Sequence, residues 1–229
     1  MNNVKLISYT QPDPDFIEEA EGIDNLQELV AYCARVSNPS NQVNTETSER
    51  LIKYLVEHAH WSPLEMVNAC LEINTTRDIA HQIVRHRSFA FQEFSQRYAN
   101  VDAMDNTFVK REARLQDPKN RQASIENDDY LLASAWSEKQ DRVIAAAQEA
   151  YDWAIENGIA KEQARAVLPE GCTKTRLYMN GSIRSWVHYI ELRSGNGTQK
   201  EHAEIAKACA HQIAKIFPSI FEFAESERK

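Results

Sequence analysis

Helical periodicity runs through most of this chain, and it is the feature that most limits the fold. The clearest case is residues 129–157, which are rich in Ala, Glu and Gln and stop at Gly158. Only residues 66–74 and 173–179 have the features of strands, and they do not alternate with helices in the β-α-β order of a parallel sheet. We therefore predict an α+β fold: a single helix-rich domain over 1–229 with a small, mainly antiparallel sheet.

Capping and breaking residues place the boundaries of several elements. Asp24 is predicted to cap a first helix, and Thr76 a later helix that continues to about Arg87. Pro63 interrupts the helical pattern between them. The polar stretch 99–127 is expected to form a surface excursion or a lid. Further helices are predicted after Asn44 or Thr45, over 161–168, over 182–193 and over 199–216.

The distribution of charge indicates a pocket for a small anion. The chain carries a net charge of −8, yet residues 76–98 have a balance of +2 and residues 165–193 a balance of +3. A nucleic-acid-binding protein is usually basic along a whole face, so two basic islands in an acidic chain disfavour that function. The sequence has no run of about eighteen apolar residues and no secretory layout at its N-terminus. We therefore expect a cytoplasmic protein that binds neither membrane nor nucleic acid.

The cysteines and histidines do not indicate a metal site. Four cysteines are scattered without a C-x-x-C pair, which argues against a disulfide framework and against zinc. His58 and His60 lie near Glu65, but no H-E-x-x-H motif is present. We expect no bound metal. Cys172, in a polar turn, is the one cysteine that we consider as a nucleophile.

One stretch near the middle of the chain combines side chains that a nucleotide or a heterocyclic cofactor requires. On a helix, Gln82, Arg85 and His86 would share one face. In an extended segment, Glu93, Ser95 and Arg97 would point the same way. Such an array offers charge-assisted donors for a phosphate, and both donors and acceptors for a heterocycle. The alternative is a solvated, charged helix end.

The same stretch resembles the signature of the flavin-dependent thymidylate synthase family. Arg85-His86-Arg87 is followed by seven residues and then Ser95, with a glutamate two positions before this serine and an arginine two after it. Three flanking segments also resemble the family. Residues 60–65 are similar to its H-x-S-P-x-E turn, 164–169 to its A-R-x-x-L-P segment, and 184–193 to its R-S…L-R helix. The resemblance covers residues 25–220 in the family's order.

The resemblance implies reductive methylation of deoxyuridine monophosphate to thymidine monophosphate. Methylenetetrahydrofolate would supply the carbon, and FAD reduced by NADPH would supply the hydride. The positions that match the family's flavin contacts are Ser62, Arg85, His86, Arg87, Glu93, Ser182, Ile183, Arg184 and His188. The positions that match its nucleotide contacts are Gln82, Arg85, Glu93, Phe94, Ser95, Gln96, Arg97, Arg165 and Arg193.

Arg193 matches the arginine that favours ionisation of the uracil ring, so the resemblance implies catalysis without an enzyme nucleophile. C5 of uracil is a poor nucleophile until negative charge develops at N3 and O4, and a guanidinium stabilises that charge. The flavin performs the redox chemistry, and the protein supplies orientation and electrostatics. Ser182 departs from the family, in which many members have asparagine, so a hydroxyl would replace the amide there.

The predicted helix 182–193 would place these residues on two sides. Arg184 and His188 are four apart and share a face, whereas Arg193 lies nine residues beyond Arg184, about 180° around the helix. This separation favours active sites assembled between subunits, and the resemblance implies a homotetramer with shared sites.

Two other functions remain open from the residues alone. One is a flavoprotein that modifies a nucleotide by another reaction. The other is a helical module that binds nucleic acid through the basic island around Arg85–Arg97, which would explain the arginines but not Gln82, Glu93 or Ser62.

Overall fold

A four-stranded antiparallel sheet lies at the centre of the structure, a computed structural model. It describes residues 3–20, 22–104, 107–195 and 197–221. The strand order is β1-β2-β6-β3, and every neighbouring pair is antiparallel. The bounds are β1 Asn3–Tyr9, β2 Asn68–Thr76, β6 Lys174–Ser182 and β3 Ala90–Glu93. The α+β class with a small antiparallel sheet is confirmed.

Alternating side chains give the sheet one apolar face. In β2, Ala69, Leu71 and Ile73 are fully buried, as the alternation in the sequence predicts, because successive strand residues point to opposite faces. In β6 the buried positions are Leu177 and Met179.

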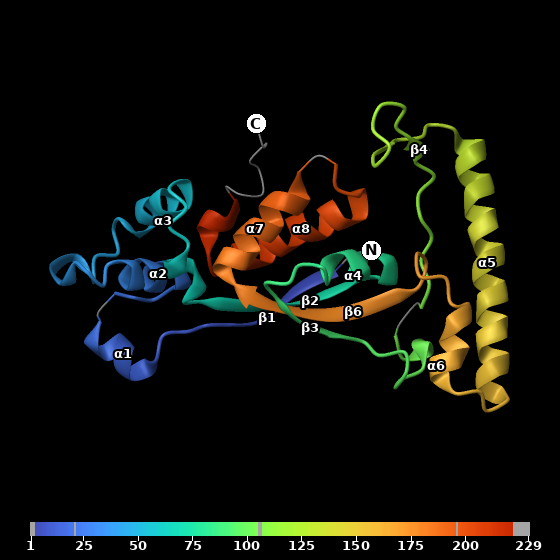
Figure 1. Cartoon of the computed structure of the whole chain (residues 1–229), viewed down its shortest axis with the longest axis horizontal. Coiled ribbons are helices and arrows are strands. Elements are labelled where there is room, and N and C mark those ends of the chain that lie inside the picture. Colours follow the sequence, from blue (N-terminus) through green and yellow to red (C-terminus); the bar gives the residue numbers. More distant parts are fainter. Residues whose placement is uncertain (1–2, 21, 105–106, 196, 222–229) are drawn as a thin grey trace.

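Three helices cover this apolar face: α4 (Arg77–Ile83), α7 (Ile183–Ser194) and α8 (Lys200–Ile213). Figure 1 shows α7 and α8 side by side over the sheet. The largest side chain in the core, Trp186 of α7, is fully buried and donates a hydrogen bond to the Ala69 carbonyl at 3.0 Å.

The remaining helices lie at the two ends of the sheet (Figure 1). One end carries α1 (Pro14–Glu19), α2 (Leu26–Ala34) and α3 (Ser48–Glu57). The other carries the 27-residue α5 (Tyr130–Glu156) and α6 (Lys161–Ala164). A second, smaller apolar cluster joins α5 to α6 through Tyr151, Ala154 and Ala164. Short 3-10 helices occupy Pro39–Asn41, Ser62–Glu65 (η2), Val101–Ala103, Arg165–Val167 (η4) and Pro218–Ile220.

Two helix boundaries differ from the predictions. The first helix is capped by Asn25 and not by Asp24, because Asn25 and Glu28 form a reciprocal capping box. The helix after Thr76 ends at Ile83, four residues before Arg87. It ends there because the chain must turn so that Phe89 enters the core and the following residues pair with β6 as β3.

The sequence analysis did not identify β1 as a strand. Its outward residues are mostly exposed, and only Val4 is buried, so the alternation is too weak to detect. Pairing with β2 over Asn3–Tyr9 stabilises it, with an irregular register between Leu6 and Ser8.

The stretch 99–127 is held by ion pairs to three helices. Its Arg111 and Arg114 bind Asp78 of α4 and Glu201 of α8, at 2.8 and 2.6 Å, and Lys110 binds α5. It also contains the two-residue strands β4 (Leu115–Gln116) and β5 (Ser124–Ile125). Residues 105 and 106 lie outside the described residues. Its role as a lid stays a prediction.

Candidate active site

In the Arg85-His86-Arg87 turn, the His86 side chain points into the protein, whereas Arg85 and Arg87 point outward. Arg193 donates from Nε to His86 Nε2 at 2.9 Å, and the His86 ring meets the Tyr189 ring edge-on at 4.9 Å. Burial, with the positive charge of Arg193, lowers the pKa of His86 to about 4. The ring is therefore neutral near pH 7 and accepts at Nε2. Arg85 and Arg87 are exposed.

Because α4 ends at Ile83, Gln82, Arg85 and His86 do not share a helical face, and that prediction is wrong. Gln82 and His86 nevertheless both face the buried cluster around Tyr189, whereas Arg85 points to solvent. Tertiary packing brings two of the three side chains together by a different route.

The helix α7 carries its predicted site residues on two sides. At its start, Ser182 is the N-cap and accepts from the Ser185 backbone N–H at 3.3 Å. Arg184 forms an ion pair with Glu65 of η2, and the His188 ring lies 4.4 Å from the Trp61 ring. Arg193, at the other end, faces His86. The two sides of the helix thus contact different parts of the chain.

Two further predicted flavin positions have contrasting surroundings. Ser62 begins η2 and is exposed. Ile183 is fully buried in the core, and its backbone N–H donates to the Val67 carbonyl at 3.0 Å.

Glu93 is the last residue of β3, and two hydrogen bonds hold its carboxylate. Its Oε1 accepts from Arg77 at 3.2 Å and from the Thr175 hydroxyl at 2.8 Å. The next residue, Phe94, donates its backbone N–H to the Arg176 carbonyl at 2.8 Å. Beyond it the chain turns instead of remaining extended, so Glu93 and Ser95 do not lie on one strand.

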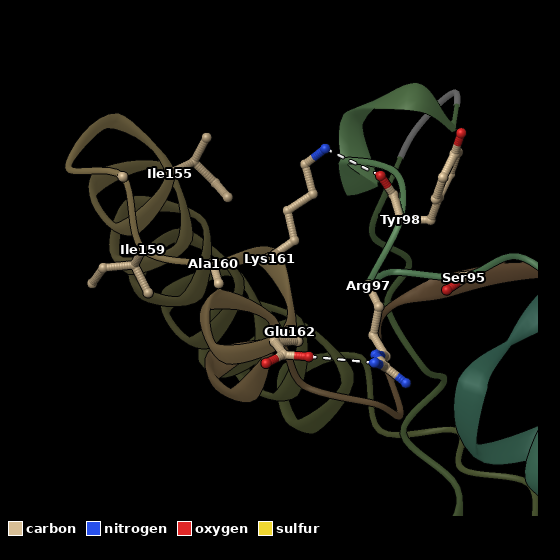
Figure 2. A pocket seen from close by; sticks show the side chains of 9 residues that line it. Ser95, Arg97, Tyr98, Ile155, Ile159, Ala160, Lys161 and Glu162 are labelled. Atoms are coloured by element: carbon tan, nitrogen blue, oxygen red, sulfur yellow. Dashed lines mark hydrogen bonds and ion pairs between the residues drawn. The ribbon is translucent and has the colours of Figure 1, made fainter.

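The Ser95–Tyr98 turn forms one wall of a pocket of about 720 Å³ (Figure 2). The opposite wall comes from the end of α5 and from α6. Lys161 donates to the Tyr98 carbonyl at 3.1 Å, and Arg97 lies 3.5 Å from Glu162. Apolar side chains complete the lining: Ile155, Ile159 and Ala160.

A second pocket, of about 460 Å³, shares Glu162 with the first. Arg77, Gln96 and Arg165 also line it. Gln96 is only 3% exposed, and its Nε2 is buried without a hydrogen-bond partner among the described residues. Arg165 forms no ion pair with any of the described residues. Because buried amide donors are nearly always paired, this nitrogen indicates a missing polar partner.

The predicted nucleotide contacts are therefore brought together only in part. Four of them line the two pockets: Ser95, Gln96, Arg97 and Arg165. Gln82, Arg85 and Arg193 do not line either pocket.

Three residues near these sites were not predicted as functional. Lys161 and Glu162 line the first pocket, and the only sequence signal was their place just before Ala164-Arg165. His202 of α8 is fully buried and lies within hydrogen-bonding distance of Gln82 and Tyr189. A histidine three residues before the apolar pair Ile205-Ala206 on an amphipathic helix was the available signal.

The cysteines have the properties of structural thiols. Burial raises the pKa of Cys172, as it does for Cys33, Cys70 and Cys209. A thiol with a raised pKa is a weak nucleophile near pH 7, because the thiolate is the reactive form.

Comparison with known proteins gives one consistent family. The family model described as thymidylate synthase complementing protein (Thy1) matches residues 20–219. A probable flavin-dependent thymidylate synthase of Paramecium bursaria Chlorella virus 1 is 49% identical over 218 residues, which cover 95% of this chain and 96% of that protein. A flavin-dependent thymidylate synthase of Synechocystis sp. is 44% identical, with 95% and 97% covered.

A solved structure has the same fold. It is a UMP/dUMP methylase, PolB from Streptomyces cacaoi, bound with 5-Br dUMP. The TM-score is 0.77 at 25% sequence identity, and the alignment covers 97% of this chain and 94% of that one.

Proposed function

The chain belongs to the family of flavin-dependent thymidylate synthases, and we propose that it methylates deoxyuridine monophosphate to thymidine monophosphate. The relatives' names support a flavin cofactor, and the neighbouring methylase that binds 5-Br dUMP supports a pyrimidine nucleotide as substrate. In its finer form the proposal takes FAD as the flavin, methylenetetrahydrofolate as the carbon donor and NADPH as the reductant.

The observation that carries the proposal is the pocket lined by Gln96 and Arg165. A buried amide nitrogen without a partner, beside a guanidinium without an ion pair in the described residues, suits an anionic ligand with polar acceptors. Ser95 and Arg97 line the adjoining pocket and extend the same donor set. A nucleoside monophosphate has both the negative charge and the hydrogen-bond acceptors that this pocket requires.

The residues around η2 and α7 fit a flavin. Trp61 and His188 offer aromatic surface, and the Ser182 and Ser62 hydroxyls can hydrogen-bond a heterocycle. Arg85 and Arg87, exposed and without ion pairs in the described residues, can bind its phosphates. A bound flavin would supply hydride-transfer chemistry that side chains lack. Ser62, Arg85, Arg87, Ser182, Arg184 and His188 would hold it.

We assign Arg193 the stabilisation of charge on the uracil ring. His86 accepts from Nε, which orients the guanidinium while its two terminal nitrogens have no partner among the described residues. A neutral His86 accepts this bond without repelling the cation. The free nitrogens can stabilise negative charge at N3 and O4 of uracil, which makes C5 nucleophilic without attack by a cysteine.

The proposal extends to assembly and location. Arg193 contacts His86 and lines neither of the two pockets of its own chain, which supports sites shared between subunits of a homotetramer. Exposed Trp136, Val143 and Trp153 on α5 offer apolar surface for such contacts. No helix in the described ranges is both long and apolar enough to cross a membrane. We place the enzyme in the cytoplasm.

Tritium release from C5-labelled deoxyuridine monophosphate tests the reaction. We expect release by yellow, flavin-containing protein only when methylenetetrahydrofolate and NADPH are both present. Arg193→Ala should keep its flavin and its reduction by NADPH but lose release, because only ring ionisation depends on this guanidinium. Arg142→Ala, on the exposed face of α5, is the matched control and should stay active. Colourless protein that does not take up FAD would contradict the proposal.

A further inference from the structure

A continuous series of hydrogen bonds connects α7, α8 and α4 through the interior. Tyr189 Oη lies 3.1 Å from His202 Nε2, and His202 Nδ1 lies 3.2 Å from Gln82 Oε1. Gln82 Nε2 in turn donates to Gln199 Oε1 at 2.9 Å, and Gln199 Nε2 donates to Glu201 Oε2 at 2.9 Å. His202 and Tyr189 are almost completely buried, at 0% and 1% exposure.

The carboxylate at one end fixes the direction of every bond in the series. Glu201 is ionised. Burial raises its pKa, but hydrogen bonds from its own backbone N–H, from Gln199 and from Arg114 lower it, and the pKa falls below its ordinary value as a result. An ionised carboxylate only accepts, so the Gln199 amide must present its NH₂ to Glu201 and its carbonyl to Gln82. Gln82 must then present its NH₂ to Gln199 and its carbonyl to His202.

The same logic sets the protonation of His202. Its Nδ1 faces a carbonyl and must carry the hydrogen. In a neutral ring Nε2 is then the acceptor, and it receives the Tyr189 hydroxyl hydrogen. Burial is the main cause that lowers the pKa of His202 to about 3, so the neutral form is the one present near pH 7. One tautomer of one ring therefore satisfies both neighbours.

We propose that His202 is a positioning residue that, with Gln199, locks the Gln82 amide in one orientation and thereby makes the site select uracil over cytosine. This inference rests on the proposed function, which gives Arg193 a contact with the uracil ring, and on the family resemblance, which implies that Gln82 contacts the nucleotide. The locked amide has one carbonyl lone pair and one N–H left for a ligand. Position 4 of the ring carries a carbonyl acceptor in uracil and an amino donor in cytosine. A fixed N–H donates to the uracil O4, whereas an amide that can rotate could turn its carbonyl toward the amino group of cytosine.

The tautomer of His202 tests the locked geometry without any turnover. In nitrogen-15 and carbon-13 histidine spectra of flavin-loaded protein at pH 7, we expect a neutral ring protonated at Nδ1, assigned by its absence in His202→Asn. In Gln199→Met the link to Glu201 is lost, and the resonance should shift. A ring protonated at Nε2, or at both nitrogens, would overturn the proposal.

Nucleotide selection tests the consequence. Dissociation constants for deoxyuridine and deoxycytidine monophosphate are measured on flavin-loaded protein. In His202→Leu and Gln199→Met, the preference for deoxyuridine monophosphate should fall by about tenfold or more, the effect of one hydrogen bond to a buried group. His202→Asn keeps a donor near the Nδ1 position and should recover part of the preference. His211→Leu, on the exposed side of the same helix, should leave it unchanged.

The outcomes separate this proposal from the function on which it rests. Variants that fold, hold flavin and keep the wild-type preference would overturn it even though the enzyme assignment stands. If His202→Leu does not fold, Gln199→Met decides, because it leaves His202 and the core in place. If the wild type binds neither nucleotide, the proposed function fails, and the selection claimed for His202 fails with it.

Discussion

At the scale of single residues, burial makes His86 and His202 respond to pH together. In the folded protein their pKa values are lowered to about 4 and about 3, from an ordinary value of 6.5. Between those values the unfolded chain binds more protons than the folded one. Stability is therefore fully present above pH 6.5 and is lost as the pH falls toward 3.

This difference predicts acid sensitivity with a specific origin. For the fully buried His202, the free energy of unfolding should fall by roughly 2 kcal/mol between pH 7 and pH 5. Urea unfolding at the two pH values measures it. His202→Asn should be less stable than wild type at pH 7 but should lose less on acidification. Equal losses in both proteins would contradict the assignment.

Ala59 is a second residue whose backbone has a measurable consequence. Its φ of +56° is in the left-handed region, and it is the only non-glycine residue there among those described. Its side chain is exposed, so Ala59→Gly loses no packing and relieves the strain. We expect a gain of about 0.5–1 kcal/mol in thermal or urea unfolding, after the entropy of the added glycine. Ala135→Gly, in the second turn of α5 and also exposed, should instead lose about 1 kcal/mol. Destabilisation at both positions would contradict the prediction.

At the scale of elements, the packing of Phe89 against β6 connects the Arg85–Arg87 turn to the sheet. A Cβ at Gly181 would lie 2.4 Å from Phe89 Cδ1, so no larger residue fits without moving the ring. Phe89 is buried and also packs edge-on against Trp186, with 4.8 Å between the ring centroids.

Gly181→Ala should therefore destabilise the protein by about 1–3 kcal/mol and weaken flavin retention, because the displaced ring would move the turn. Unfolding midpoints and bound flavin per chain measure both effects. Phe89→Leu combined with Gly181→Ala should cost less than the sum of the two changes. Gly195→Ala, whose Cβ would meet nothing closer than 3.8 Å, is the matched control. If the double variant loses as much stability as the two single variants together, the added methyl group does not act through the Phe89 ring, and the prediction is contradicted.

At the scale of the whole molecule, Arg193 is not among the residues that line the pocket of Arg97, and this arrangement predicts complementation between subunits. Arg97→Ala and Arg193→Ala should each be inactive, and co-expression should restore a minority of the activity. Recovery is expected because some sites in mixed oligomers combine an unaltered Arg97 from one subunit with an unaltered Arg193 from another. Tritium release measures the recovery.

The chain offers a matched control for this experiment. Arg97 and Arg165 line adjoining pockets that share Glu162 within one chain, so Arg97→Ala and Arg165→Ala should not complement each other. Mixed oligomers of Arg97→Ala and Arg193→Ala that stay inactive would contradict shared sites and leave the enzyme assignment intact.

Local sequence was sufficient wherever a signal repeats over many residues. The helix α5, which ends before Gly158, follows from side-chain periodicity and backbone preference alone. The alternation in β2 predicted its buried face for the same reason. The Arg85-His86-Arg87 signature and its flanks were also sufficient to identify the family, because a motif needs no coordinates.

Tertiary structure decided what depends on contacts between distant residues. The helix α4 ends at Ile83 because Phe89 must reach the core, although local preference would extend it. The series through Gln82, His202 and Glu201 joins α4 to α8, so the sequence could not reveal it. The sequence determined which polar side chains are available. Packing determined which of them are buried together, because the cost of an unpaired buried polar group is set by its neighbours in space.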